Sequence, residues 1–365
     1  MAVAASRAPC PPIKVRFMHT GLIHSIDFDA DGKQSGHLRL PYSIDRSPYF
    51  HIHVPICRIR NGAGPRVLLM AGNHGDEYEG ELLLARLMRR LAPAAVRGEI
   101  TILPMVNVPA VMAARRRSPY DDGNLNRAFP GSADGTPTAR IAHFLEHDLF
   151  RRHDVVFDLH AGGTSMAHLP CALIEQQGPP ERFARALQLM QALAMPYGFV
   201  AENGAAAPTS MGAAARAGAI GISGEFGGGA TVTRETMRLT ARAIDNLLIA
   251  TGAIAAPVLS EADRPAEPMQ LLALDSHDQA IYATRRGWFE PVADVGDRVA
   301  AGDLAGYYHD LTRLDLPEEA LHFGQGGIVI SRRLHTDSEA GDCLIQVARP
   351  VAAGDLAAPQ ADIGG

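Results

Sequence analysis

Between residues 65 and 255, short apolar runs of strand length alternate with longer segments whose apolar residues recur at helical spacing. The runs are RVLLMAG, GEITILPMVN, HDVVFDLHA and AIGISGEFG, and the helical segments include EGELLLARLMRRLA, ARIAHFLEHDLFRR, PERFARALQLMQALA and TRETMRLTARAIDNLLIATG. This alternation predicts an α/β fold in which helices cover both faces of a sheet. Ligands of such sheets bind at the carboxyl ends of the strands, so the residues that follow each run are the first candidates for function.

The sequence on either side of this core predicts further regions. Residues 1–60 contain a turn-rich stretch, DFDADGKQSGH, and an apolar one, HIHVPICRI, which we interpret as edge strands and an extension packed on the core. The proline-rich APVLSEADRPAEP at residues 256–268 is typical of a linker. Beyond it, glycines separate short apolar runs and no helical period is visible. We therefore predict a main domain at residues 61–255 and a small β domain at residues 269–352.

Composition and charge narrow the class of protein. The 365 residues are 47% hydrophobic and 20% charged, which is ordinary for a globular chain, and the net charge of −6 argues against a general affinity for nucleic acid or an anionic membrane. The four cysteines form no CxxC pair, and no segment resembles a signal peptide or a membrane helix. We therefore expect a cytoplasmic protein with reduced cysteines that binds neither membranes nor nucleic acid.

A metal site is the first candidate function. In AGNHGDEYEGE, His74 and Glu77 are three residues apart on a turn that enters a helix, so their side chains project to one side. An HxxE pair alone often arises by chance or as a helix cap. In VVFDLHAGG, however, His160 lies at the end of a second strand, and the extended backbone places Asp158 on the same face. A His, Glu, His set with a free fourth position is typical of catalytic zinc, and Asp158 could orient a ligand histidine. The alternative for His160 is an ordinary hydrogen-bonded histidine at a strand end.

Two further segments carry residues that a hydrolase needs. Glu225 in ISGEFGGG precedes glycines that let a ligand approach the backbone, so its carboxylate could take a proton from water and pass it to a leaving amine. The alternative is a capping or surface glutamate. In ARRRSPYDDGNLNRAFPG, Arg127 with Asn126 could hold a substrate carboxylate, because the guanidinium fork matches its geometry. The three arginines at 115–117 offer a second clamp, although adjacent arginines are often simply solvated.

Four motifs, in their order along the chain, resemble the succinylglutamate desuccinylase and aspartoacylase family, distant relatives of the zinc carboxypeptidases. They are NHGDEYEG, GNLNRAFPG, DLHAGG and GEFGGG, and the resemblance spans most of residues 20–350. The stretches DFDADGKQSGHLRLPYSIDRSPY and IRNGAGPRVLLMAGNHGDEYEG are similar, more closely, to the ectoine-utilisation deacetylases, which remove acetyl from N-alpha-acetyl-L-2,4-diaminobutyrate. The resemblance implies a zinc-carboxypeptidase-like α/β/α sandwich with a mixed central sheet and a small C-terminal β domain.

Carried onto this sequence, the resemblance implies a zinc-dependent hydrolase that removes a short acyl group from a small N-acyl amino acid. It implies that His74, Glu77 and His160 bind one zinc ion, which makes residues 61–255 the catalytic domain, and that Glu225 is the general acid and base of amide hydrolysis. It further implies that Asn126 and Arg127 bind the substrate carboxylate, and we choose Arg116 as a further arginine that binds the substrate.

Two positions depart from the family pattern. Asn124 precedes LNR where the family often has aspartate, as expected in the deacetylase branch. Phe226 follows the catalytic glutamate where those deacetylases commonly have leucine, so that it could reshape the pocket. The sequence does not identify the residue that binds the side-chain amine of diaminobutyrate. The candidates are Asp121, Asp122 and Glu79.

The C-terminal region has a second resemblance. GWFEPVADVGDRVAAGDLAG resembles the barrel-sandwich of biotinyl and lipoyl carriers, which attach their cofactor to a lysine, but the only lysines are Lys14 and Lys33, so a carrier function is excluded. In relatives this domain borders the active-site entrance, and we expect a wall that restricts access to small substrates.

Other functions and the oligomeric state stay open at this point. The alternatives are a deacylase of another N-acyl amino acid, such as N-acetylaspartate or N-succinylglutamate, a zinc carboxypeptidase, and a metal-binding protein without turnover. The sequence is also compatible with a homo-oligomer.

Overall fold

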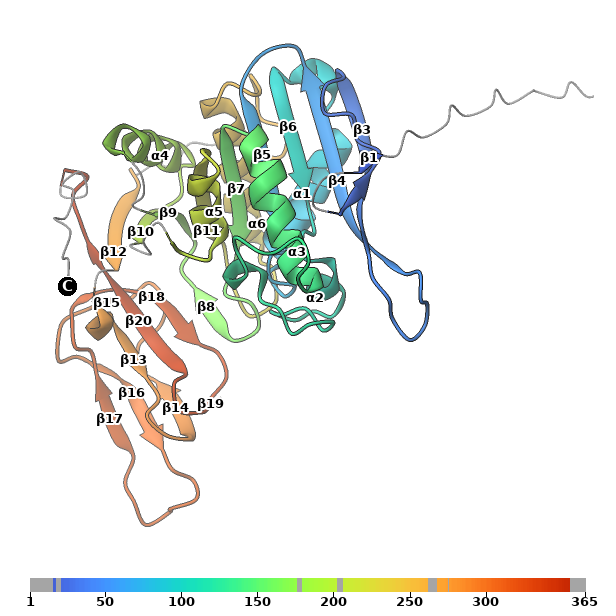
Figure 1. The fold of residues 1–365 in the computed structure, drawn as a ribbon. Coiled ribbons are helices and arrows are strands. Elements are labelled where there is room, and N and C mark those ends of the chain that lie inside the picture. The colour runs from blue at the N-terminus through green and yellow to red at the C-terminus, as the bar shows by residue number, and fades with distance from the viewer. Residues whose placement is uncertain are drawn as a thin grey trace, which may run out of the picture.

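The computed structural model describes residues 16–17, 21–175, 179–201, 206–261, 268–274 and 276–354, and Figure 1 shows their arrangement. Within these residues, sixteen strands form one mixed sheet in the order β1-β2-β3-β4-β6-β5-β7-β11-β9-β10-β12-β20-β18-β15, with β8 paired to β18 and β13 to β20. β5, β6, β7 and β11 are mutually parallel, whereas β4 and β9 run antiparallel to their neighbours β6 and β11. The predicted α/β fold with a mixed central sheet is therefore confirmed.

The strands of this sheet have the following bounds: β1 Arg16–Phe17, β2 Ile23–His24, β3 Gly32–Pro41, β4 His51–Asn61, β5 Arg66–Ala71, β6 Gly98–Leu103, β7 Val155–His160, β8 Met166–His168, β9 Cys171–Glu175, β10 Tyr197–Ala201, β11 Ile220–Glu225, β12 Gln270–Leu274, β13 Ala280–Tyr282, β15 Arg298–Val299, β18 Gly327–Arg333 and β20 Cys343–Pro350.

The central strands are continuous apolar runs because both of their faces are buried. In β5, Val67 and Leu69 belong to one hydrophobic core, whereas Leu68 and Met70 belong to a second core on the opposite face. Side chains alternate along a strand in this way because its period is two residues. The sheet thus separates two cores.

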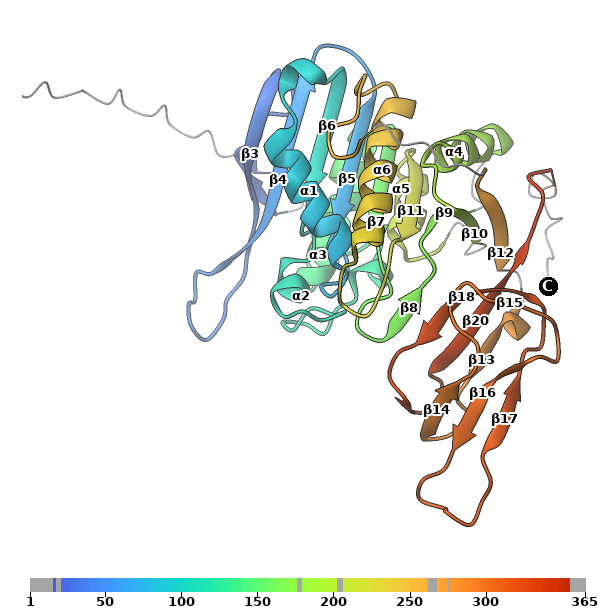
Figure 2. The same ribbon diagram turned by 180° about the vertical axis from the view of Figure 1, so that it is seen from behind.

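Helices cover both faces of this part of the sheet. Side chains of α1, α4 and α6 pack in the first core, and those of α3 and α5 pack in the second. Figures 1 and 2 show these two layers from opposite sides. Threonine side chains cap the N-termini of α3, α5 and α6 by accepting backbone N–H groups. The helix bounds are α1 Tyr78–Arg90, α2 Val108–Met112, α3 Pro137–Phe144, α4 Pro180–Ala192, α5 Ser210–Arg216 and α6 Arg234–Ala250.

The C-terminal β region, residues 276–350, adds a second sheet. Its strands are β14 Gly287–Pro291, β16 Leu304–His309, β17 Glu319–His322 and β19 Asp337–Ser338, in the order β17-β16-β14-β19, and every pairing is antiparallel. Phe289 and Tyr308 of this sheet share a core with Val329 and Ile345 of the large sheet. The predicted small β domain is present, and four strands of residues 276–350 belong to the large sheet: β13, β15, β18 and β20.

Two features differ from the sequence prediction. HIHVPICRI is not an edge strand: β4 lies between β3 and β6, because β3 pairs along its whole outer side. The start of the predicted linker is also fixed to α6, because Asp245 accepts the backbone N–H groups of residues 258–260. Residues 262–267 of that linker lie outside the described residues. The domain bounds stay predictions. In the part of the chain that the structure describes, no helix is long and apolar enough to cross a membrane.

Candidate metal centre and active site

The turn between β5 and α1 carries His74 and Glu77. Gly72 has a φ of +70°, in the left-handed region that favours glycine. A Cβ on Gly75 would lie only 2.0 Å from the carbonyl carbon of Ala110, so only glycine allows the turn to approach α2 this closely. Glu77 is the N-cap residue of α1, and its Oε1 lies 2.7 Å from His74 Nδ1. The turn therefore directs both side chains to one point, as the HxxE spacing predicts.

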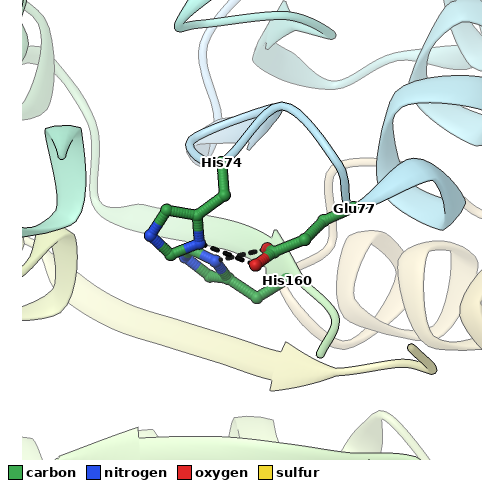
Figure 3. Close-up of side chains that lie close together, drawn as sticks. All are labelled: His74, Glu77 and His160. Atoms are coloured by element: carbon green, nitrogen blue, oxygen red, sulfur yellow. Dashed lines mark hydrogen bonds and ion pairs between the residues drawn. The ribbon is translucent and has the colours of Figure 1, made fainter. Parts of the chain in front are cut away.

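His160 reaches the same point from the end of β7. His160 Nδ1 lies 2.9 Å from Glu77 Oε2, and the ligand atoms of His74, Glu77 and His160 all lie within 4.8 Å of one another. Figure 3 shows the two imidazole rings meeting the carboxylate. All three side chains are buried. Among the described residues, this is the one group of three or more potential ligands that close together.

The outer nitrogen of each histidine faces an oxygen acceptor. His160 Nε2 donates to Asp158 Oδ2 at 2.8 Å, and His74 Nε2 lies 3.2 Å from Asn124 Oδ1. Such contacts hold the proton on Nε2 and turn Nδ1 toward a metal. Two imidazole nitrogens and a carboxylate oxygen are the donor set of catalytic zinc. The residues present therefore fit a zinc ion.

Asp158 is itself held by several hydrogen bonds. Its Oδ2 accepts from Ser210 Oγ at 2.5 Å and from Asn73 Nδ2 at 2.9 Å, in addition to His160. Ser210 is the first residue of α5, so the start of this helix helps to fix the orientation of the ligand histidine. The sequence predicts a role for Asp158 but not for Ser210, because no motif marks the start of α5.

Burial and charge act in opposite directions at this centre. Burial disfavours ionisation of Glu77, but the imidazoles of His74 and His160 outweigh it and hold the pKa of this carboxyl well below its ordinary value. Burial likewise disfavours the imidazolium of His160, yet the carboxylates of Asp158 and Glu77 raise its pKa well above the ordinary value. The site thus concentrates negative charge around the two imidazoles, which is what a divalent cation requires.

Glu225 stands beside this centre at the end of β11. It is the partner of His160 in the parallel ladder between β11 and β7, so the two side chains leave the sheet on the same face. Among the described residues, its buried Oε2 has no hydrogen-bond partner. Burial, with the charge of Glu77, raises the pKa of Glu225. A carboxyl with these properties suits proton transfer. The ring of Phe226, by contrast, is buried against Phe157 in the core.

The predicted carboxylate anchor is brought to the same end of the sheet. Arg116 Nη1 lies 3.3 Å from His74 Nδ1 and 3.7 Å from Glu77 Oε1. Asn126 Oδ1 accepts the backbone N–H of Ser210, and Arg127 Nη1 donates to the carbonyl of Asn126. Burial, together with the charge of Arg116, lowers the pKa of Arg127. Two guanidinium groups that repel each other form a favourable site for an anion.

The other candidates from the sequence have structural partners or are buried. Arg117 pairs with Asp122 at 2.8 Å, and Asp121 accepts the backbone N–H and hydroxyl of Thr138 at the start of α3. Glu79 is 1% exposed within α1. The contacts of Asp121 and Asp122 offer no support for a role of either residue in binding a substrate amine.

Comparison with known proteins agrees with this geometry. A family model described as the succinylglutamate desuccinylase/aspartoacylase catalytic domain matches residues 63–251. The N-alpha-acetyl-L-2,4-diaminobutyric acid deacetylase of Halomonas elongata is 36% identical over 327 residues, which cover 90% of this chain and 94% of that protein.

Two solved structures are similar over nearly the whole chain. The product-bound ectoine utilization protein EutE (DoeB) from Ruegeria pomeroyi has a TM-score of 0.85 and 31% identity, covering 91% of this chain and 100% of that one. A succinylglutamate desuccinylase/aspartoacylase from Rhodobacter sphaeroides has a TM-score of 0.85 and 33% identity, covering 90% and 99%. The chain therefore belongs to the succinylglutamate desuccinylase and aspartoacylase family of deacylating hydrolases.

Proposed function

We propose that this protein is a zinc-dependent amidohydrolase that removes acetyl from N-alpha-acetyl-L-2,4-diaminobutyrate, a step of ectoine degradation. The observation that carries the proposal is the convergence of His74, Glu77 and His160 beside Glu225. The deacetylase from Halomonas elongata, matched over 90% of this chain, supports the choice of substrate. We further propose that the enzyme acts in the cytoplasm on this small molecule without a nucleic-acid or membrane partner.

In this proposal His74, Glu77 and His160 hold one zinc ion, and Asp158 and Asn124 orient the two histidines. A zinc ion bound there supplies Lewis acidity to the acyl carbonyl oxygen and to the attacking water. Glu225 accepts the proton of that water and donates it to the departing α-nitrogen. The products are acetate and the free diamino acid.

The substrate is held by a second set of residues: Arg116, Arg127 and Asn126. Arg127 and Asn126 bind the α-carboxylate, and Arg116 lies close enough to the ligand residues to stabilise negative charge that develops on the acyl oxygen. Charge-assisted contacts of this kind fix the amide bond relative to Glu225. The C-terminal β region limits the site to small substrates.

The test is release of free amine from a panel of N-acyl amino acids by purified protein whose zinc content has been measured. The panel contains N-alpha-acetyl-diaminobutyrate, N-acetylaspartate and N-succinylglutamate. The proposal predicts the highest kcat/KM on the acetylated diamino acid. Preference for another panel member would overturn the substrate and keep the chemistry, whereas zinc-loaded protein inactive on all of them would overturn the deacylase itself.

A further inference from the structure

A short strand, β8, joins the C-terminal β region to the active site. β8 pairs antiparallel with β18, so that Ser331 is the partner of His168 and Arg333 the partner of Met166. Backbone bonds extend this pairing at both ends, from Leu334 N to the carbonyl of Ser165 at 2.8 Å and from Leu169 N to that of Ile330 at 2.7 Å. The segment after His160 is therefore an edge strand of the C-terminal region.

The other side of this segment is bonded to the loop that follows Glu225. We call residues 227–230 the glycine loop. Gly162 N donates to the carbonyl of Gly227 at 3.0 Å, Gly229 N to that of Met166 at 3.1 Å, and Ala230 N to that of Gly163 at 2.9 Å. Residues 162–169 thus lie between the glycine loop and β18, with backbone hydrogen bonds on both sides.

The contact between β8 and the glycine loop is too close for a side chain. A Cβ on Gly228 would lie 2.1 Å from the carbonyl oxygen of Met166. The backbone of Gly228 is not left-handed, so the close approach alone requires glycine here. β8 and the glycine loop therefore pack directly against each other.

The glycine loop is in turn continuous with Glu225. Phe226 N donates to the carbonyl of His160 at 2.9 Å, and its buried ring fixes the chain immediately after the glutamate. A path of backbone hydrogen bonds therefore runs from β18 through β8 to the glycine loop, which follows Glu225 in the chain.

We infer that β8 is a positioning element through which the C-terminal β region holds Glu225 in place for proton transfer. This inference rests on the proposed function and gives the C-terminal region a second role beside that of a wall. The two roles differ in kinetics. A wall governs substrate entry and therefore KM, whereas a positioning element governs the geometry of the chemical step and therefore kcat.

The kinetic test compares Gly228→Ala with Gly36→Ala, a matched control on β3. A Cβ on Gly36 would meet its nearest neighbour, Ser25 Oγ, at 3.4 Å, an ordinary contact. We expect Gly228→Ala to lower kcat by about 10- to 100-fold with KM nearly unchanged and zinc content intact. Gly36→Ala should keep the parent kinetics. An unchanged kcat in Gly228→Ala, or a rise confined to KM, would overturn the inference.

A second test does not depend on activity. The Leu334 side chain packs over Gly229, since Leu334 Cδ1 would lie 3.2 Å from a Cβ built there. Leu334→Ala should speed hydrogen exchange of the Gly229 and Ala230 amides, measured by mass spectrometry. Leu314→Ala, at a site 85% exposed in the same region, is the matched control and should leave that exchange unchanged. Equal protection in both variants would overturn the coupling. If the parent protein is inactive on every N-acyl amino acid, the proposed function fails, and the exchange result still decides whether the two parts are coupled.

Discussion

Glu225 and His160 are direct partners in the parallel ladder between β11 and β7, and both side chains leave the sheet on the same face. The sheet itself thus sets the separation between a candidate proton-transfer group and a candidate metal ligand. Sites built on strands hold their geometry better than sites built on loops. The predictions below use this arrangement.

Glu225→Gln should keep zinc bound and lose about 100- to 10,000-fold in kcat, because the amide cannot accept a proton. The parent enzyme has a matching pH signature. Since burial raises the pKa of Glu225 above its ordinary value of 4.5, kcat/KM should fall with decreasing pH at a midpoint above 4.5. Steady-state kinetics across pH, with zinc analysis of both proteins, checks this. A variant with near-parent turnover would remove Glu225 from the chemistry.

Asn124→Ala should weaken zinc binding by about 10- to 100-fold, because the variant loses the oxygen that faces His74 Nε2 at 3.2 Å. His160→Ala, which removes a ligand, should lose both zinc and activity. Competition with a chelator of known affinity measures the first effect, and metal analysis measures the second. Full zinc stoichiometry in His160→Ala would contradict the ligand assignment.

Arg116→Ala and Arg117→Ala form a matched pair within the arginine triplet. Arg116 lies beside His74 and Glu77, whereas Arg117 is paired with Asp122. We expect Arg116→Ala to lower kcat/KM by at least about 10-fold and Arg117→Ala to leave it near the parent value. Arg127→Ala should chiefly raise KM. A larger loss in Arg117→Ala than in Arg116→Ala would show that Arg117, and not Arg116, contacts the substrate.

Glu81 predicts a pH dependence of stability in the metal-free protein. Burial, with the charges of Glu77 and Asp76, raises the pKa of this carboxyl from 4.5 to about 8. The folded state therefore keeps a proton that the unfolded state releases, so this group lowers stability as pH rises from 4.5 to about 8. Glu81→Gln removes that loss. Relative to the parent, the variant should gain stability on the order of 1 to 4 kcal/mol between about pH 5 and pH 8, as measured by urea unfolding. A gain in the free energy of unfolding that does not grow with pH would contradict the inference that Glu81 is buried as a neutral carboxyl.

Local pattern was enough to predict the central strands, the long helices and the convergence of His74, Glu77 and His160. Strand period and motif spacing act over a few residues, and parallel strands bring their carboxyl ends together. Arg116 could be singled out from its neighbours only by resemblance, because the triplet has no internal period.

Features that depend on distant pairings could not be predicted in this way. The inner position of β4 follows from its pairing with β3 and β6 on either side. Ser210 reaches Asp158 across 52 residues of sequence. The three-residue β8 is too short for a strand signal, and it is defined only by its partner β18. The aromatic ring of Phe226 faces the core rather than the pocket, a direction that sequence position alone does not give.

We propose that deacetylation depends on one zinc ion held by His74, Glu77 and His160. The most direct measurement is the initial rate of acetate release from N-alpha-acetyl-diaminobutyrate while zinc is titrated into chelator-treated protein. We expect a rate that rises linearly with zinc and levels off at one ion per chain, and no recovery in His160→Ala. Full activity of the chelator-treated protein, or recovery of activity in His160→Ala, would contradict it.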